Sequence, residues 1–96
     1  MAYFEDGTPV LVRTYSAGVH YGNLSGPAGK EIVLTNARRI WSWQGAFTLS
    51  EISLHGIVSG KVSAIVPVIL LTEAIEIIPI SSEAEFNLNS QPRFIP

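Results

Sequence analysis

The most apolar stretch of the chain, VSAIVPVILLTEAIEIIPI at residues 62–80, decides the fold class. A membrane-spanning helix needs about 20 mostly apolar residues, and this stretch is interrupted by Pro67, Glu73, Glu76 and Pro79. It is also rich in Val and Ile, whose branched side chains favour strands. We therefore interpret it as two buried strands, at residues 61–71 and 74–80, and we expect no association with a membrane.

The segments that precede this stretch show the same preference for strands. Alternating apolar residues predict strands at 9–15 and 19–24 and a longer strand at 30–43, bent near Asn36 and Ala37. Glycine- and serine-rich turns separate these segments. The expected fold class is mainly β, a small barrel or sandwich of five to six short strands with one short α-helix.

That helix is predicted at about residues 49–55. Thr48 and Glu51 have the spacing of a capping box, in which each side chain satisfies a free backbone amide at the helix start. Phe47 and Ile52 are spaced for a hydrophobic staple across the same turn. Gly56 suits the position that ends a helix.

Beyond a core at about residues 8–80, we expect an extended C-terminal tail at 81–96. Residues 91–96 are expected to be extended, because Pro92 and Pro96 prevent a closing helix there. The tail has room only for a short helical turn within 81–88, for which Ser82 would be the cap.

Size and charge predict one small domain, residues 1–96, that associates with itself. The chain has a formal net charge of −2, which excludes a bulk nucleic-acid binder. Hydrophobic residues make up 47% of it and charged residues only 15%, against about 25% charged residues in ordinary domains. We expect a homo-oligomer whose interface uses the strand at 62–71 and at least one tryptophan.

The sequence offers little for catalysis. Cysteine is absent, and His20 and His55 do not have the spacing of metal ligands. The glycines of residues 18–22 do not open onto a helix as a phosphate-binding loop requires. We therefore expect no enzyme activity, no cofactor and no metal.

The densest group of candidate binding residues is NARRIWSW, residues 36–43. Arginine is a planar bidentate donor for phosphate, and an indole is a stacking surface for a base. One interpretation is a nucleotide or phosphate site made by Asn36, Arg38, Arg39, Trp41 and Trp43. The alternative is structural, with the tryptophans in the core or at a subunit interface and Arg39 packed over an indole.

Strand alternation places Arg38 and Arg39 on opposite faces. Because Arg39 would share its face with both tryptophans, we expect Arg38 to be the exposed one. His20 and Tyr21 are further candidate binding residues, with a hydrogen-bonded structural histidine as the alternative.

Several segments resemble a family of short, uncharacterised bacteriophage and prophage proteins. They are TYSAGVHYGNL at 14–24, GKEIVL at 29–34, NARRIWSWQGA at 36–46 and LTEAIEII at 71–78. The resemblance spans about residues 11–80, and the tail departs from it. It implies a phage origin and assigns no activity. A weaker likeness, carried by residues 18–24 and 30–37, is to the small Sm-like and SH3-like barrels.

These observations lead to two hypotheses about function. The first is a phage-encoded homo-oligomeric binding protein, acting in counter-defence, that captures a small phosphorylated, nucleotide-like ligand or blocks a host defence protein. The second is a structural component of the virion, in which neighbouring subunits cover the apolar surface. The expected location is the host cytoplasm, or the virion for the second hypothesis.

Overall fold

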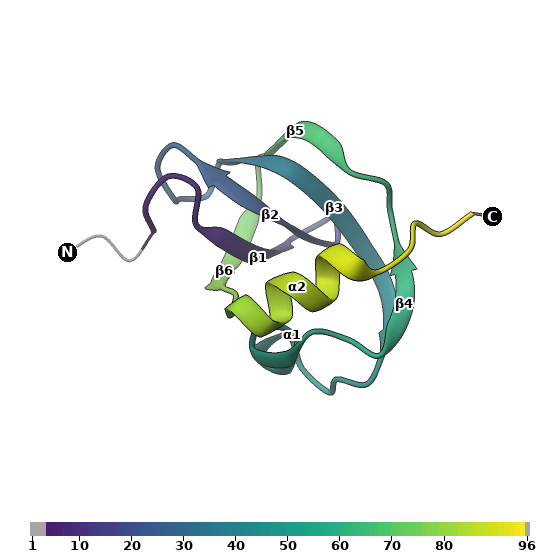
Figure 1. Ribbon diagram of the computed structural model, residues 1–96. Helices are drawn as coiled ribbons and strands as arrows, with labels where there is room; N and C mark the ends of the chain where they lie inside the picture. The colour runs from purple at the N-terminus through teal and green to yellow at the C-terminus, as the bar shows by residue number, and fades with distance from the viewer. Residues whose placement is uncertain (1–3, 96) are drawn as a thin grey trace.

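The structure, a computed structural model, describes residues 4–95 and consists of one curved antiparallel sheet with two short helices (Figure 1). The sheet order is β4-β3-β2-β1-β6, and β5 also pairs with β3. The prediction of a mainly β fold with five to six strands is confirmed. The elements are β1 (Pro9–Thr14), β2 (Val19–Ser25), β3 (Ile32–Gln44), α1 (Leu49–His55), β4 (Ser59–Val62), β5 (Val66–Leu71), β6 (Ala74–Pro79) and α2 (Ser82–Ser90).

Strand β3 is the longest strand and organises the sheet. Its first part pairs with β5, from Ile32 opposite Leu71 to Ala37 opposite Val66, and its second part pairs with β4 along the same edge. The predicted bend is present at Asn36, whose φ of 50° lies in the left-handed region that asparagine tolerates better than most residues. The bend turns the two parts of β3 toward different neighbours.

The predicted buried strand at 61–71 is wrong in two respects, because it is two strands and because most of its residues, Val68 and Leu70 among them, are exposed. β4 ends at Val62 and β5 begins at Val66, with residues 63–65 between them. The interruption lies beside residues 38 and 39 of β3, between the pair Ile40–Val62 and the pair Ala37–Val66.

The two faces of the sheet bury separate apolar cores. Leu11 on β1 belongs to the core under the helices, with Ile40, Ile52 and Leu88. Its neighbours Val10 and Val12 face the core inside the curve of the sheet. That inner core also includes Leu24, Ile32, Leu34, Ala37 and Leu71. β1 is therefore buried on both faces, which explains its nearly continuous apolar sequence.

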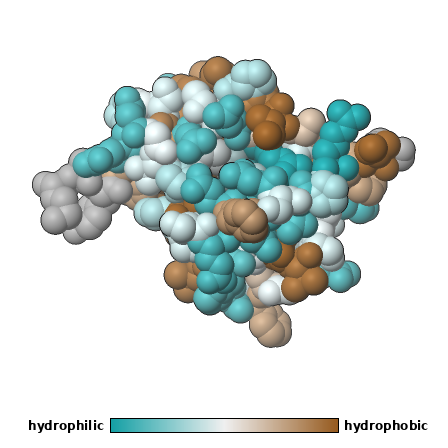
Figure 2. Space-filling model, in the orientation of Figure 1, coloured by the Kyte–Doolittle hydropathy of each residue, from teal (hydrophilic) through white to brown (hydrophobic). Residues whose placement is uncertain are grey.

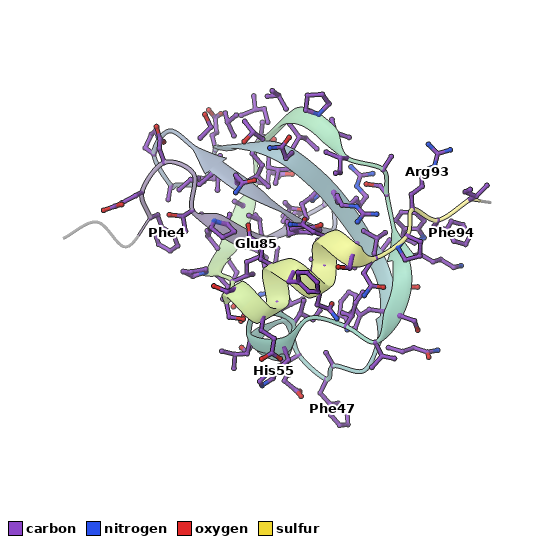
Figure 3. All side chains as sticks on the ribbon, viewed as in Figure 1. Phe4, Phe47, His55, Glu85, Arg93 and Phe94 are labelled. Carbon is purple, nitrogen blue, oxygen red and sulfur yellow. The ribbon has the colours of Figure 1, made fainter. Side chains whose placement is uncertain are left out.

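Helix α1 begins and ends where the sequence predicts. The amide of Glu51 donates to Thr48 Oγ1 at 3.2 Å, and the Glu51 carboxylate accepts from the amide of Phe47 at 3.1 Å. Gly56 follows the helix with a φ of 80°. The predicted staple is wrong, because Phe47 is 96% exposed and extends away from the domain (Figure 3).

The expected extended tail at 81–96 is wrong for residues 82–90, which form α2, whereas residues 91–95 contain no helix. Ser81, rather than Ser82, caps this helix by accepting from the amide of Ala84 at 3.0 Å. Ala84 and Leu88 are fully buried against the core under the helices. Pro92 does not prevent the helix, because it follows the C-cap residue Gln91. Residue 96 of the predicted tail lies outside the described residues.

The surface retains many exposed apolar side chains. In Figure 2 the hydrophobic residues, in brown, interrupt the polar surface at several separate places. On β5, Val66, Val68 and Leu70 are all exposed. None of the helices in the described part of the chain has the length and apolarity needed to span a bilayer.

Candidate functional site

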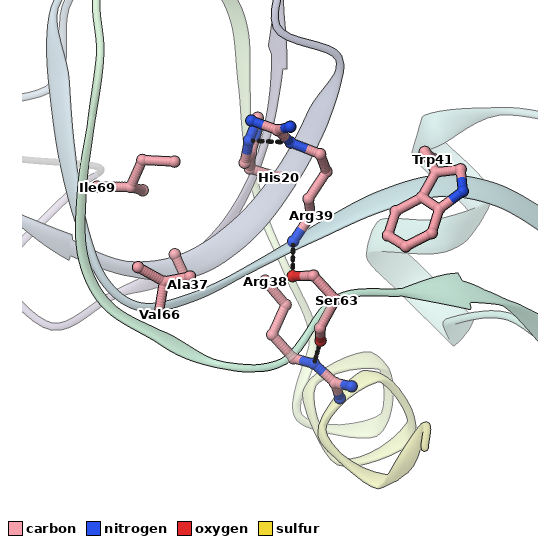
Figure 4. A pocket seen from close by; sticks show the side chains of 8 residues that line it. All are labelled: His20, Ala37, Arg38, Arg39, Trp41, Ser63, Val66 and Ile69. Carbon is pink, nitrogen blue, oxygen red and sulfur yellow. Dashed lines mark hydrogen bonds between the residues drawn. The ribbon is translucent and has the colours of Figure 1, made fainter. Parts of the chain in front are cut away.

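A cavity of about 300 Å³ lies between the middle of β3, the connection from β4 to β5, and β5 itself (Figure 4). Its walls include the apolar side chains Ala37, Val66 and Ile69. The polar contributions come from His20, Arg38, Arg39, Trp41 and Ser63. No carboxylate is among these lining residues.

His20 and Arg39 form a hydrogen-bonded pair in this cavity. They are directly opposite each other in the register of β2 and β3, so their side chains share a face of the sheet. Arg39 Nε donates to His20 Nε2 at 3.1 Å. His20 is 1% exposed, and its burial, aided by the Arg39 charge, lowers its pKa from 6.5 to about 4. The imidazole is therefore neutral at physiological pH.

Apart from this hydrogen bond, the Arg39 side chain is exposed to solvent. Its backbone amide donates to Ser63 Oγ at 2.8 Å, which fixes the strand at the cavity mouth. Within the described residues, neither Nη atom of Arg39 has a hydrogen-bonding or ionic partner. Arg39 therefore presents free, cationic donors beside the cavity.

Trp41 lines the same cavity and is 47% exposed. Its ring meets that of Phe94 edge to face, with centroids 5.6 Å apart and an interplanar angle of 88°. Lys61 Nζ lies 5.0 Å from the centroid of the Phe94 ring. The segment after α2 thus contacts the indole, while much of Trp41 stays accessible.

The expectation that Arg38 is the exposed arginine is wrong. Arg38 is 4% exposed, and its side chain points toward α2, away from the Arg39 guanidinium (Figure 4). Its Nε donates to Ser63 O at 2.7 Å, and its Nη1 donates to Leu88 O at 3.1 Å and Gln91 O at 2.8 Å. Arg38 therefore binds the end of α2, a nine-residue helix where the sequence predicts only a short helical turn. The hydrogen bonds of its guanidinium group stabilise the fold.

The two tryptophans do not share a site. A β-bulge between Ile40 and Ser42 changes the alternation of β3, so Trp43 turns to the core under the helices. There its Nε1 donates to the carbonyl of Ala46 at 3.2 Å. Trp43 thus matches the structural alternative, whereas Trp41 lies at the cavity.

Asn36 and Tyr21 line a different cavity, of about 230 Å³, beside Glu85 and Asn89 of α2. The Tyr21 hydroxyl donates to Asn89 Oδ1 at 2.7 Å, and burial raises the pKa of this phenol. The structure therefore brings four of the seven candidate residues to the first cavity: His20, Arg38, Arg39 and Trp41.

Sequence reasoning missed the apolar walls and Ser63. Val66 and Ile69 come from a strand that the sequence identified, but its position beside Arg39 depends on the bend of β3. No pattern in the sequence indicates that Ser63 lines a cavity, because its position there depends on the interruption between β4 and β5. Among the described residues, no group of three or more His, Asp or Glu side chains could hold a metal ion.

A family model described as "Domain of unknown function (DUF6948)" matches residues 7–88. No curated protein and no solved structure matches the chain. The matched range includes every residue that lines the His20–Arg39 cavity.

Proposed function

We propose that this chain, which belongs to the DUF6948 family of unknown function, is a homo-oligomeric binding protein. It would capture a small nucleotide-like anion. The supporting observation is Arg39, an exposed cation with free Nη donors at the mouth of a largely apolar cavity. Arginine donors of this kind bind phosphate and carboxylate groups in bidentate fashion.

The surroundings of Arg39 favour an anion with a flat apolar part. Trp41 offers an accessible indole face, and Ala37, Val66 and Ile69 form walls without charge. Stacking on an aromatic ring stabilises a bound base by about 1–3 kcal/mol. The lack of a lining carboxylate removes the repulsion that an anion would otherwise meet.

Self-association is part of the proposal. Val66, Val68 and Leu70 form an exposed apolar face on β5, and within the described residues β5 pairs only with β3. Pro67 removes one amide from the open edge of β5, so we place the contact on the exposed side chains of this face, which another copy of the chain would cover. The exposed part of Trp41 adds an aromatic group of the kind that is enriched at interfaces.

The biological setting we propose is a phage protein that acts in the host cytoplasm. There it would remove a nucleotide signal used in host defence or block a host defence protein. The segments that resemble phage and prophage proteins, residues 14–24 and 36–46 among them, support this setting.

A second candidate function is a structural part of the virion. It is favoured by the number of large apolar side chains that stay exposed, which include Phe47, Val58, Phe86 and Ile95. Neighbouring subunits of a particle would cover such a surface.

Native mass spectrometry of the protein purified from a host that expresses its defence systems tests the proposal. A closed oligomer carrying a small anionic ligand that Arg39→Ala loses would support it. A ligand-free protein that is soluble only with other virion proteins would favour the second candidate. Arg39→Lys is the matched control, since it keeps the charge and loses the bidentate geometry.

A further inference from the structure

The His20 side chain has Arg39 as its hydrogen-bonding partner within the described residues. Arg39 Nε lies 3.1 Å from His20 Nε2 (Figure 4). A guanidinium nitrogen can only donate a hydrogen bond, so His20 Nε2 accepts it. Because burial keeps the imidazole neutral at physiological pH, its single proton lies on Nδ1.

The position of His20 would suit an apolar side chain. His20 is 1% exposed, and Val12, which is directly opposite it on β1, is fully buried in the inner core. His20 Nδ1 is buried and has no partner in the part of the chain that the structure describes. An unsatisfied buried donor costs free energy that an apolar ring of similar size would avoid. The contact that such a ring could not make is the hydrogen bond to Arg39.

This hydrogen bond determines which donors of Arg39 remain for a ligand. A carboxylate or phosphate can pair with Nε and one Nη of an arginine, or with both Nη groups. Nε of Arg39 is already used by His20. The Nη groups, which have no partner among the described residues, are left as the pair that can meet an anion.

We infer that His20 is the positioning residue of this site: by accepting from Nε, it holds the Arg39 guanidinium at the cavity with both Nη groups available to an anion. This inference rests on the proposed capture of an anion, and it adds the residue that orients the donor. His20 acts through Arg39 and does not itself contact the ligand.

Holding Arg39 in place should strengthen binding. Arg39 is a long, exposed side chain that loses rotamer freedom when a ligand fixes it. Its acceptor is buried on β2, directly opposite it in the register of the sheet, so the two side chains share a face. Part of the ordering of Arg39 is therefore complete before an anion arrives, which reduces the free-energy cost of binding.

The test is a calorimetric titration of the full-length protein at pH 7.5 with uridine monophosphate as the anionic probe. His20→Phe keeps a ring of similar size and removes the acceptor, so it should weaken binding about tenfold. His20→Gln supplies an amide oxygen as the acceptor and should stay within about threefold of the original affinity. Thermal melting verifies that both variants are folded.

Arg39→Lys provides the control for a merely structural role of His20. A lysine keeps the charge but has no Nε–H for His20 to hold. Adding His20→Phe to Arg39→Lys should therefore change the affinity by less than about twofold. A tenfold loss in this background as well would mean that His20 acts on the cavity and not through Arg39, and the inference would be wrong.

¹⁵N NMR of the free protein examines the same contact without a ligand. The original chain should show the Nδ1–H tautomer of His20 and a slowly exchanging Nε–H of Arg39, and His20→Phe should make that exchange fast. An Nε2–H tautomer, or equally fast exchange in both proteins, would overturn the inference. If uridine monophosphate binds the original chain and His20→Phe equally well, the proposed function survives and the positioning role does not. If it does not bind the original chain, both are wrong.

Discussion

Arg38 and Arg39 are consecutive residues of β3, yet their guanidinium groups lie on opposite sides of the strand (Figure 4). Arg38 donates to three backbone carbonyls and closes the end of α2 against the sheet. Arg39 donates to His20 and keeps its Nη atoms free beside the cavity. One arginine therefore stabilises the fold, and the other is available to a ligand.

This difference predicts opposite results for two matched substitutions. Arg38→Ala should lower the free energy of unfolding by about 3 kcal/mol, because it leaves buried carbonyls without their charged donor. Arg39→Ala should lower it by about 1 kcal/mol or less, since it removes one partly exposed hydrogen bond. Urea unfolding of the two variants measures both values. Equal losses of unfolding free energy in the two variants would contradict a structural role for Arg38.

The position of α2 predicts that two neighbouring side chains differ in their effect on stability. Leu88 is fully buried, whereas Phe86 is 76% exposed on the same helix. Leu88→Ala should therefore destabilise the domain by about 3 kcal/mol, and Phe86→Ala by less than about 0.5 kcal/mol. Thermal or urea unfolding provides the comparison. A negligible effect of Leu88→Ala would mean that α2 does not pack on the core.

The lowered pKa of His20 predicts a specific dependence of stability on pH. Between pH 6.5 and about 4, the unfolded chain binds a proton at this residue and the folded chain does not. Stability should therefore be fully present above pH 6.5 and fall as the pH decreases to about 4, by on the order of 3 kcal/mol from this group.

His20→Phe isolates this contribution, because other groups titrate in both proteins. The difference in unfolding free energy between the original chain and the variant should change across this window and be constant above it. His55→Gln, which alters an exposed imidazole that bonds to Glu83, is the control. A constant difference between pH 7 and pH 4 would show that His20 titrates normally.

The apolar face of β5 predicts an oligomer that responds to a single charge. Light scattering at micromolar concentration should give a mass above that of the monomer for the original chain, with dissociation on dilution. Val68→Lys places a charge on the exposed face of β5 and should shift the protein to the monomer. Phe47→Lys changes an exposed side chain outside β5 and should leave the mass unchanged. If the original chain is a monomer, the prediction of self-association is wrong.

Much of the fold could be predicted because it depends on local chemistry. Alternation of apolar residues predicted most of the strands, and the Thr48–Glu51 capping box predicted α1. These signals lie within a few residues of the structure that they specify. The separation of Arg38 and Arg39 to opposite faces followed from the same alternation.

The remainder depended on long-range contacts that no local pattern reports. Arg38 is buried because α2 presents carbonyl oxygens to it, from residues 50 and 53 positions later in the chain. The two tryptophans separate because a bulge, set by pairing with β4, changes the alternation between them. Strict alternation therefore predicted wrongly that Arg38 is exposed and that Trp43 lies on the same face as Trp41.

The central claim is that Arg39 and the cavity beside it bind a small anion. Isothermal titration with uridine monophosphate, for the original chain and for Arg39→Ala, tests it most directly. We predict saturable binding with a dissociation constant in the micromolar range, which Arg39→Ala weakens at least about tenfold while the protein stays folded. Binding of the same affinity in both proteins, or no binding in the original chain, would contradict the claim.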